Sequence, residues 1–373
     1  MRRFFFGFLL IFTLAAAAFN WRPIASLFAA ETAPVAGPFS AGELQQFRSL
    51  SPIDTHAHAF VTDPAFEALL DKLNLHILDI LVVSDMEGGH ADLEKQRQEA
   101  WSVVHASHGF ARLCTSFDPY SFNQPNYARK VIRGLDQDFA DGAIAVKLWK
   151  NVGMEIKDAN GHYLMPDNPI FAPIFDDIAA HNKTLVAHVA DPDSGWQPPN
   201  LASPDYEYYR DHPKAYMYGK TGVPSKPEIL AARDHVLEKH PNLRVVGAHL
   251  GSMESNLAEL GQHLDRYPNF AVDIAARMPY FEMYPRDTMI AFITKYQDRL
   301  IYGTDLEFRP GSTESPRDIE SGYANDWRYF ATADTLSYKG KPVKGLALPT
   351  SILRKIYHEN AAKWFPGILN SAH

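Results

Sequence analysis

The chain has 373 residues, of which 46% are hydrophobic, 12% are aromatic and 21% are charged. This composition supplies a large apolar core and excludes a disordered or fibrous protein. The formal net charge is −8, and the chain has neither a basic block nor zinc-finger spacing, so we expect no nucleic-acid partner. Cys114 is the only cysteine, which excludes an intrachain disulfide and a thiolate metal cluster.

Residues 1–30 have the pattern of an export signal. Arg2 and Arg3 precede an apolar run over 4–19, which is shorter than the roughly 20 residues needed to span a bilayer. Small residues at 15–18 and at 29–30 offer cleavage sites. We therefore expect an exported protein, periplasmic or secreted. The alternative is an uncleaved anchor, which would be the chain's one contact with a membrane.

Strand-like and helical patterns then alternate along the chain. A short apolar or β-branched run predicts a strand, and a longer amphipathic stretch predicts a helix. Strands are predicted at 50–58, 77–84, 110–117, 142–149, 184–189, 243–249, 270–275 and 299–305. Helices are predicted at 64–73, 91–107, 127–139, 170–181, 227–239, 255–267, 285–296 and 350–364.

Eight β/α alternations predict a single (β/α)8 TIM-type barrel, although the length alone would allow two domains. We assign 31–49 to a lead-in, 50–366 to the barrel and 367–373 to a C-terminal tail. The connections after strands 5 and 8, at 190–225 and 306–349, are too long for plain loops. They follow strands, so they belong to the barrel face that carries active sites, unless they serve as oligomer contacts.

Metal-binding side chains stand at the strand ends. Strand 1 carries Asp54, His56 and His58 at alternate positions, which in a regular strand share one face. Three more strands end in His188, His249 and Asp305. Any one histidine could be a core residue bonded to a carbonyl, but the set predicts one divalent metal site. Three imidazoles and a carboxylate suit Zn²⁺ best, with Mn²⁺, Fe²⁺ or Co²⁺ as alternatives.

These motifs resemble the amidohydrolase superfamily, in particular the amidohydrolase-related branch that contains aminocarboxymuconate-semialdehyde-decarboxylase-like proteins. The resemblance covers residues 50–366 and rests on the stretches at 54–58, 188, 247–252, 303–305 and 359–365. It implies that the metal is bound by His56, His58, His188 and Asp305. It also implies that His249 polarises the scissile group and that Asp305 transfers the proton.

Lys147, near the end of strand 4, bears on the number of metal ions. In binuclear superfamily members a strand-4 lysine is carboxylated by CO₂ and bridges two ions. The branch that this chain resembles usually carries one ion, so we expect an uncarboxylated Lys147 paired with a carboxylate, and one ion per chain. Two ions would imply carboxylation.

Three residues are candidates for substrate binding. Arg277, at the end of strand 7, could pair with a substrate carboxylate through its planar fork, or form a structural ion pair with Asp273 or Glu254. Trp149 and Trp196 could line the pocket.

Three functions fit these residues. The favoured one is a metal-dependent hydrolase that activates water to attack an amide, lactone or ester. The second is a metal-dependent, non-oxidative decarboxylase of an aromatic or unsaturated acid, and the third is a non-catalytic exported binding barrel. The expected partner is a small-molecule substrate, and a homo-oligomer is compatible with the sequence.

Overall fold

The structure is a computed structural model that describes residues 36–83, 93–309 and 315–369. The predicted export signal at 1–30 lies outside the described residues, as do 31–35 of the lead-in and 370–373 of the tail. The described residues all belong to one compact unit, Pro34–His373. None of the helices in these ranges combines the length and the apolar character that a bilayer crossing needs.

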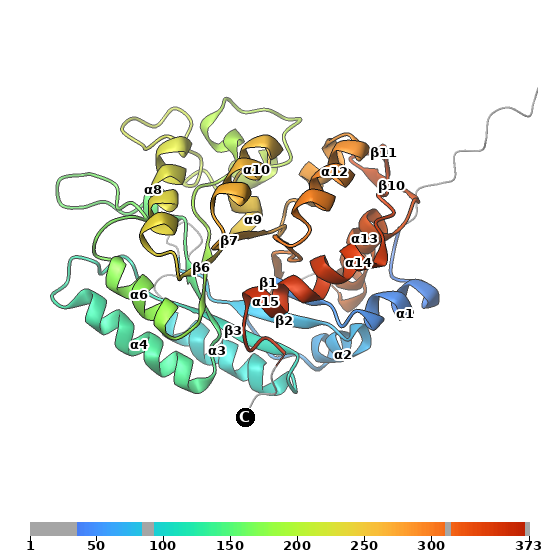
Figure 1. The fold of residues 1–373 in the computed structure, drawn as a ribbon, viewed down its shortest axis with the longest axis horizontal. Coiled ribbons are helices and arrows are strands. Elements are labelled where there is room, and N and C mark those ends of the chain that lie inside the picture. Colours follow the sequence, from blue (N-terminus) through green and yellow to red (C-terminus); the bar gives the residue numbers. More distant parts are fainter. Residues whose placement is uncertain (1–35, 84–92, 310–314, 370–373) are drawn as a thin grey trace, which may run out of the picture. The chain divides into compact units, whose positions relative to one another are not determined.

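Nine parallel strands form one sheet, in the order β8-β7-β6-β5-β4-β3-β2-β1-β9 (Figure 1). Their bounds are β1 (Ile53–Ala59), β2 (His76–Ile80), β3 (Ala111–Ser116), β4 (Ala145–Leu148), β5 (Thr184–Ala187), β6 (Arg244–Gly247), β7 (Phe270–Asp273), β8 (Leu300–Ile301) and β9 (Leu306–Phe308). Sequential parallel pairing of this kind is the pattern of a barrel.

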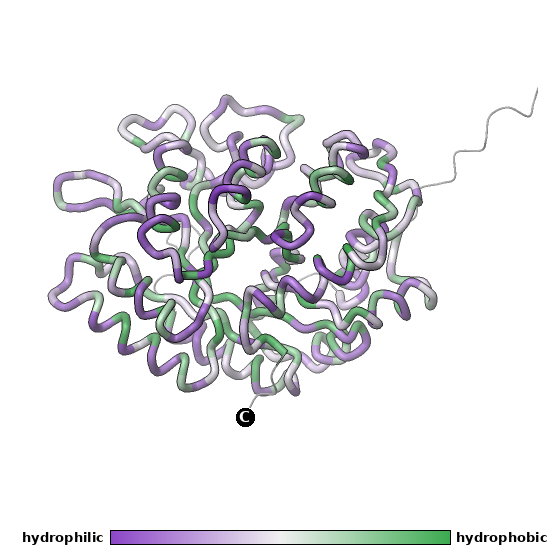
Figure 2. The backbone as a smooth tube through the Cα atoms, viewed as in Figure 1, coloured by the Kyte–Doolittle hydropathy of each residue, from purple (hydrophilic) through white to green (hydrophobic). Residues whose placement is uncertain are grey.

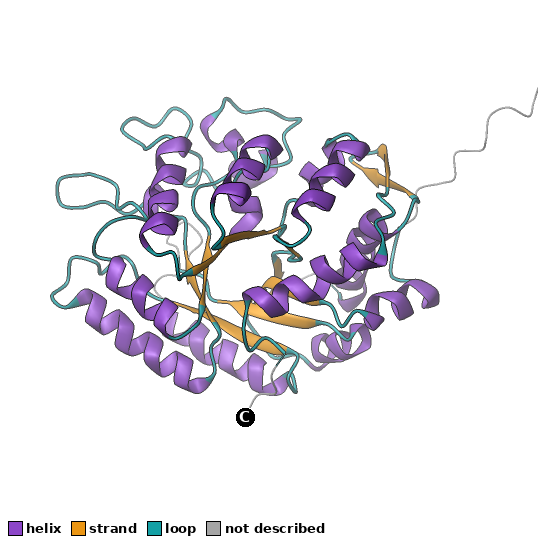
Figure 3. Cartoon of the chain, viewed as in Figure 1, coloured by secondary structure: helices purple, strands orange, loops and turns teal. Residues whose placement is uncertain are grey.

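Hydrogen bonds between β1 and the segment that holds β8 and β9 close the sheet. Thr55 N donates to Tyr302 O at 3.0 Å, and Asp305 N donates to His56 O at 2.8 Å. Further along, β9 pairs directly with the end of β1. The sheet therefore curls into the TIM-type (β/α)8 barrel that the alternation predicts, with the helices around it (Figure 3).

Most predicted helices are present within a residue or two of their expected bounds. The helices are α1 (Ala41–Ser49), α2 (Pro64–Leu73), α3 (Leu93–Ala106), α4 (Tyr127–Asp141), α5 (Asn151–Met154), α6 (Ala172–Ala180), α7 (Tyr206–Asp211), α8 (Lys226–Lys239), α9 (Ala248–Gly251), α10 (Leu257–Arg266), α11 (Met278–Met283), α12 (Arg286–Tyr296), α13 (Pro316–Ala331), α14 (Thr350–Arg354) and α15 (Asn360–Trp364). A π-helical turn, Lys355–Glu359, joins α14 to α15.

Both long connections contain structure of their own. A 3₁₀ turn (Asp193–Trp196) and α7 lie in 190–225. The connection at 306–349 contains β9, α13 and an antiparallel hairpin of β10 (Thr335–Tyr338) and β11 (Lys341–Lys344). The prediction missed α13, although Ser315 and Asp318 form a capping box at its start. The predicted strand 299–305 is shorter in the structure, since β8 covers Leu300–Ile301, and the chain turns further on at Asp305, where φ is 69°.

The core has two large clusters, and a third, small one is formed by Val82, Val83 and Trp149. The larger cluster packs the outer faces of the strands against the helices, and Figure 2 shows the alternation of apolar and polar residues along helices such as α4. The smaller cluster fills the barrel interior, where Trp364, Phe365 and Ile368 from the C-terminal segment join Ile53 and Leu78. This plug leaves the carboxyl ends of the strands as the end of the barrel with room for a site.

The expectation that Asp54, His56 and His58 share one face is wrong. The pairing of β1 with β2 shifts register between Asp54 and Ala57. A bulge of this kind reverses the alternation of side chains. Asp54 therefore faces α13, where Tyr323 OH donates to its Oδ2 at 2.8 Å, while the two histidines turn to the site.

The buried carboxyl group of Asp79 on β2 should make the stability of the protein depend on pH. Its Oδ1 accepts from Ala59 N at 2.8 Å, and its Oδ2 is buried without a partner among the described residues. Burial raises the pKa of this carboxyl to about 7, whereas an unfolded aspartate titrates near 4. The neutral carboxyl therefore stabilises the fold fully below pH ~4, and this contribution is lost as the pH rises through about 7.

We predict that Asp79→Asn removes this dependence, because the amide keeps the acceptor for Ala59 N and has no charge. Relative to the variant, the wild type should lose roughly 2 kcal/mol of unfolding free energy between pH 5 and pH 8. Urea unfolding of the metal-free proteins at both pH values measures the difference in unfolding free energy between wild type and variant. The other titrating groups are the same in both proteins, so their contributions cancel. A difference that stays constant with pH would contradict the assignment.

Candidate functional site

Three acceptor atoms converge at the carboxyl end of β1. His56 Nε2 and His58 Nε2 lie 3.4 and 3.3 Å from Oδ1 of Asp305. Both imidazoles are buried, whereas the Asp305 side chain is 33% exposed. The three ligand atoms all lie within 4.8 Å of one another, which is close enough to share one ion.

The outer nitrogen of each ring fixes its tautomer. His56 Nδ1 lies 2.9 Å from Asp273 Oδ2, and His58 Nδ1 lies 2.7 Å from Ile80 O. A carboxylate and a carbonyl can only accept, so each Nδ1 carries the proton and each Nε2 presents a lone pair to the site. A ligand histidine whose other nitrogen donates to a carboxylate or carbonyl is the usual outer arrangement of a metal site.

Two further histidines border this group. His249 Nδ1 is 2.9 Å from Ala275 O, and His188 Nε2 is 3.3 Å from Asp191 Oδ1. Burial lowers the pKa of both rings well below that of an exposed histidine, so both are neutral. His188 Nδ1 is buried and has no hydrogen-bond partner among the described residues. The ring centroids of the two histidines are 4.5 Å apart.

Lys147 lies inside the same cluster. Its side chain is fully buried, and its Nζ is 3.0 Å from His56 Nε2, to which it donates. Burial lowers the pKa of this ammonium to about 8. Within the described ranges, no carboxylate forms an ion pair with Lys147, so the carboxylate partner expected from the sequence is not found there.

Left-handed turns aim several of these side chains. Non-glycine residues with positive φ follow β5, β6, β7 and β8 in turn, namely Ala190, His249, Ala276 and Asp305. Each such residue costs on the order of 1–3 kcal/mol, and strain of this kind is concentrated at functional sites. Hydrogen bonds offset the cost, as where His249 N donates to Asp273 Oδ1 at 2.8 Å.

Asp54 holds the turn that carries Asp305. Its Oδ1 accepts from His56 N and Thr304 N at 3.0 and 3.1 Å, and its Oδ2 accepts from Thr304 Oγ1 at 2.5 Å. Together with Tyr323 OH, these bonds satisfy a fully buried carboxylate. Asp54 thus joins β1, the β8 turn and α13, and it acts on the site through Asp305.

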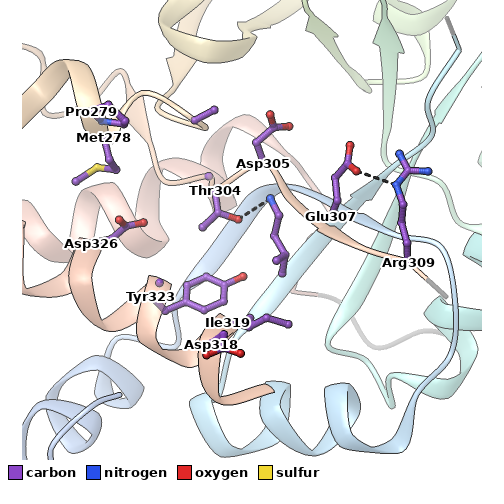
Figure 4. A pocket seen from close by; sticks show the side chains of 14 residues that line it. Met278, Pro279, Thr304, Asp305, Glu307, Arg309, Asp318, Ile319, Tyr323 and Asp326 are labelled. Atoms are coloured by element: carbon purple, nitrogen blue, oxygen red, sulfur yellow. Dashed lines mark hydrogen bonds and ion pairs between the residues drawn. The ribbon is translucent and has the colours of Figure 1, made fainter. Parts of the chain in front are cut away.

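Two cavities meet at Asp305. The inner cavity has a volume of about 270 Å³ and is lined by residues that include His58, Trp149, Lys150, His188, His249 and Arg277. The outer cavity has a volume of about 800 Å³ and is lined by residues that include Met278, Thr304, Arg309, Tyr323 and Asp326 (Figure 4). Ala276, Asp305 and Glu307 line both.

The residues predicted to bind substrate are divided between the inner cavity and the helix layer. Trp149 and Arg277 line the inner cavity, and the Trp149 indole donates to Leu81 O at 2.8 Å. Trp196 lines neither cavity; its indole donates to Pro224 O at 3.0 Å and packs against the outer core cluster. The 3₁₀ turn at Asp193–Trp196 places the Trp196 side chain in the helix layer, and no pattern in the sequence predicts the direction of this side chain.

Sequence reasoning missed the residues that support the site. Asp273 binds both His56 and the His249 backbone, although the sequence offered it only as a partner for Arg277. Lys150 Nζ lies 3.1 Å from Asp191 Oδ1 and 2.5 Å from Tyr208 OH, and so links β4 to α7. The position of Asp273 at a strand end was a usable signal, whereas nothing in the sequence placed Tyr208.

The residues present fit a divalent cation. Lone pairs of two imidazoles and one carboxylate face one another, and no donor among the described residues satisfies Asp305 Oδ1. Burial lowers the pKa of His56, which disfavours a proton as the bridging charge. Imidazole and carboxylate ligands suit Zn²⁺ and the neighbouring divalent metals.

Comparisons with known proteins agree with this geometry. A family profile described as "Amidohydrolase" matches residues 53–367. A search among curated proteins finds no match.

A search among solved structures finds similar proteins at low sequence identity. An uncharacterised TIM-barrel protein from Bordetella bronchiseptica is 15% identical, with 85% of this chain and 99% of that chain covered and a TM-score of 0.50. A 2,6-dihydroxybenzoate decarboxylase from Rhizobium is 14% identical, with 84% and 98% covered and a TM-score of 0.49. A 5-carboxyvanillate decarboxylase from Sphingomonas paucimobilis is 14% identical, with 85% and 99% covered and a TM-score of 0.49.

The profile spans most of the chain and begins at the first strand of the barrel. Its match extends from the metal-compatible residues of β1 to the C-terminal segment that plugs the barrel. The chain belongs to the amidohydrolase family.

Proposed function

We propose that this protein is a metal-dependent hydrolase that cleaves a C–N or C–O bond, in an amide, lactone or ester, within a small molecule. The observation that supports this most directly is the position of Asp305. Its carboxylate contacts both buried β1 histidines, yet a third of its side chain is open to the two cavities. A water in either cavity can therefore reach a carboxylate that also belongs to the ligand group.

In this proposal one divalent ion is held by His56, His58, His188 and Asp305. A bound ion of this kind acts as a Lewis acid and lowers the pKa of water towards ~7. Lys147 stands beside the same group, and a cationic ammonium there would repel the ion. We therefore assign the neutral amine to Lys147 in the metal-loaded protein, which its lowered pKa of about 8 favours.

The protein's own residues then move the proton. In this proposal Asp305 is ionised, because a cation beside a carboxyl group favours the charged form and so lowers its pKa, although burial alone would raise it. Its carboxylate accepts a proton from the attacking water and later passes it to the leaving nitrogen or oxygen.

The tautomer of His249 suggests a different role from the one that the resemblance implies. Because Nδ1 donates to Ala275 O and the ring is neutral, Nε2 can accept a hydrogen bond but cannot donate one. Polarisation of the scissile group would require the imidazolium form, which burial disfavours. We assign His249 instead to orienting the attacking water through Nε2.

Non-oxidative decarboxylation is the second candidate, and one observation favours it. The inner cavity is lined by the indole of Trp149 and by the cations of Lys150 and Arg277, a combination that suits an aromatic carboxylate.

The two reactions can be separated by their products. We expect the metal-loaded protein to hydrolyse small esters, lactones or amides. A pH-stat follows the acid released from esters and lactones, and an amine assay follows the cleavage of amides. Asp305→Asn should lower kcat by at least about 100-fold, because general acid–base catalysis contributes about 10²–10⁴-fold. Release of CO₂ from a panel of hydroxylated benzoic acids, without hydrolysis of any ester, lactone or amide, would instead support the decarboxylase.

Metal content tests the ligand set. Elemental analysis of the purified wild type should find about one divalent ion per chain. His56→Ala and Asp305→Ala should lose the ion, because each substitution removes a side chain that binds the metal directly. Circular dichroism should show that both variants are folded. His162→Ala, whose side chain is 80% exposed, serves as the control and should retain the ion. A count of two ions would correct the single-ion proposal and show that Lys147 is carboxylated.

Asp273 should tune the affinity for the metal without touching it. We predict that Asp273→Asn weakens metal binding by roughly 10- to 100-fold, because His56 loses the carboxylate that orients its ring. Asp167→Asn is a matched control, since Asp167 makes the same contact with Nδ1 of His235 at the surface, at 2.8 Å. Competition with a chelator measures both affinities. Equal losses in the two variants would assign the effect to general destabilisation.

A further inference from the structure

The guanidinium of Arg277 is buried and makes few contacts. Arg277 follows β7, is 7% exposed and lines the inner cavity. Its Nη1 donates to Ala276 O at 3.0 Å, and this is its one hydrogen bond to the described residues. Its Nε is buried without a hydrogen-bond partner in the same ranges, with the nearest carboxylate oxygen, on Glu254, 3.8 Å away.

Apart from Asp305, the other charged side chains that line the cavity have partners. Lys150 Nζ lies 3.1 Å from Asp191 Oδ1, and Arg309 Nε lies 2.8 Å from Glu307 Oε2. Asp205 accepts hydrogen bonds from the hydroxyls of Ser194 and Tyr280. Glu254 lies between two cations: its Oε1 is 3.5 Å from Lys226 Nζ, and its Oε2, which has no hydrogen bond to the described residues, forms a long ion pair with Arg277 Nε at 3.8 Å.

The long ion pair with Glu254 leaves N–H groups of the guanidinium unused, and an anion in the cavity would satisfy them, because buried polar groups are nearly always hydrogen-bonded. The free donors are the two N–H groups of Nη2 and the second N–H group of Nη1. Neighbouring N–H groups of this kind can form two parallel hydrogen bonds with a planar group that has two oxygens, such as a carboxylate.

We propose that Arg277 binds a carboxylate of the substrate and thereby selects small acids with a single negative charge near the reacting bond. The inference rests on the proposed function, since the inner cavity is the place where that reaction would occur.

The charges and the volume of the inner cavity limit which ligands can bind to Arg277. Asp191, Asp205, Asp305 and Glu307 also line the inner cavity, so a doubly charged group such as a phosphate monoester would be repelled. The volume of about 270 Å³ is equivalent to about nine waters at ~30 Å³ each, which admits a small molecule and excludes a polymer chain.

The anchor also has a fixed relation to the proposed proton carrier. Ala276 N donates to Thr304 O at 3.1 Å, which ties the turn that carries Arg277 to the turn that carries Asp305. A carboxylate held by Arg277 would therefore orient the rest of the substrate relative to Asp305. Arg277 is a specificity-determining residue in this assignment, and its loss should affect KM for acids more than kcat.

Binding to the metal-free protein tests the anchor independently of the reaction. Isothermal titration calorimetry would compare benzoate with benzamide, which has nearly the same shape and no charge. We expect wild type to bind benzoate more tightly, and Arg277→Gln to weaken benzoate binding by roughly 10- to 100-fold while leaving benzamide unchanged. Arg266→Gln is the matched control, because Arg266 is exposed, is paired with Glu238 at 2.8 Å and lines neither cavity.

Equal affinities for benzoate and benzamide in the wild type, or equal benzoate affinities in wild type and Arg277→Gln, would overturn the proposal. Displacement of benzoate by inorganic phosphate at lower concentration than by acetate would overturn the choice of a singly charged carboxylate. Arg277→Lys keeps the charge but loses the fork, so it should bind benzoate with intermediate affinity. Glu254 remains paired with Lys226 in both variants, and thermal unfolding checks that each is folded.

Turnover gives a second readout. For the metal-loaded protein, Arg277→Gln should raise KM for mono-4-nitrophenyl glutarate by roughly 10- to 100-fold and leave KM for 4-nitrophenyl butyrate unchanged. An equal rise of KM for both esters would contradict the anchor. If neither ester is hydrolysed, the proposed hydrolysis fails while the benzoate measurement still decides the role of Arg277.

Discussion

Three acceptor atoms that face one another are the constraint on which the centre of this protein depends, although Lys147 Nζ, 3.0 Å from His56 Nε2, donates to one of them. His56 Nε2, His58 Nε2 and Asp305 Oδ1 meet at 3.3–3.4 Å, and the protons of both rings point away, to Asp273 and to Ile80 O. Such an arrangement repels itself unless a cation lies between the atoms. The surrounding barrel must therefore be rigid enough to hold the group together before a cation arrives.

The barrel meets this requirement with hydrogen bonds that cross between strands. Asp305 N is bound to His56 O, Asp54 holds the turn after β8, and Asp273 holds both the His56 ring and the His249 backbone. The strained turns at the ends of β5 to β8 fit the same scheme, because each aims a side chain or a backbone group that a regular strand would direct elsewhere. Loss of one support is expected to loosen its neighbours, since these residues share partners.

The long connections supply the walls of the site. Tyr208 on α7 reaches Lys150 at the end of β4, and Tyr323 on α13 reaches Asp54 behind β1. The two insertions also contact each other, since Lys339 Nζ from the β10–β11 hairpin donates to Ser203 O at 3.2 Å. In a TIM barrel the loops at the carboxyl ends of the strands set the chemistry, and here they determine which charges surround the inner cavity.

The sequence by itself determined the barrel and the identity of the metal-compatible side chains. Strand and helix periods recur often enough to imply eight units, and His56, His58, His188, His249 and Asp305 stand where apolar strands end. Local patterns of this kind can be detected from sequence because they depend on neighbours a few residues apart.

The tertiary structure alone decided how those side chains are used. The bulge in β1 turned Asp54 to α13, a left-handed turn at Asp305 follows β8, and the acceptor beside each ring set its tautomer. The long ion pair of Arg277 with Glu254 likewise depends on where Glu254 and Lys226 lie in the fold. Register, tautomer and charge pairing arise from contacts between residues far apart in the chain, and no local pattern in the sequence records those contacts.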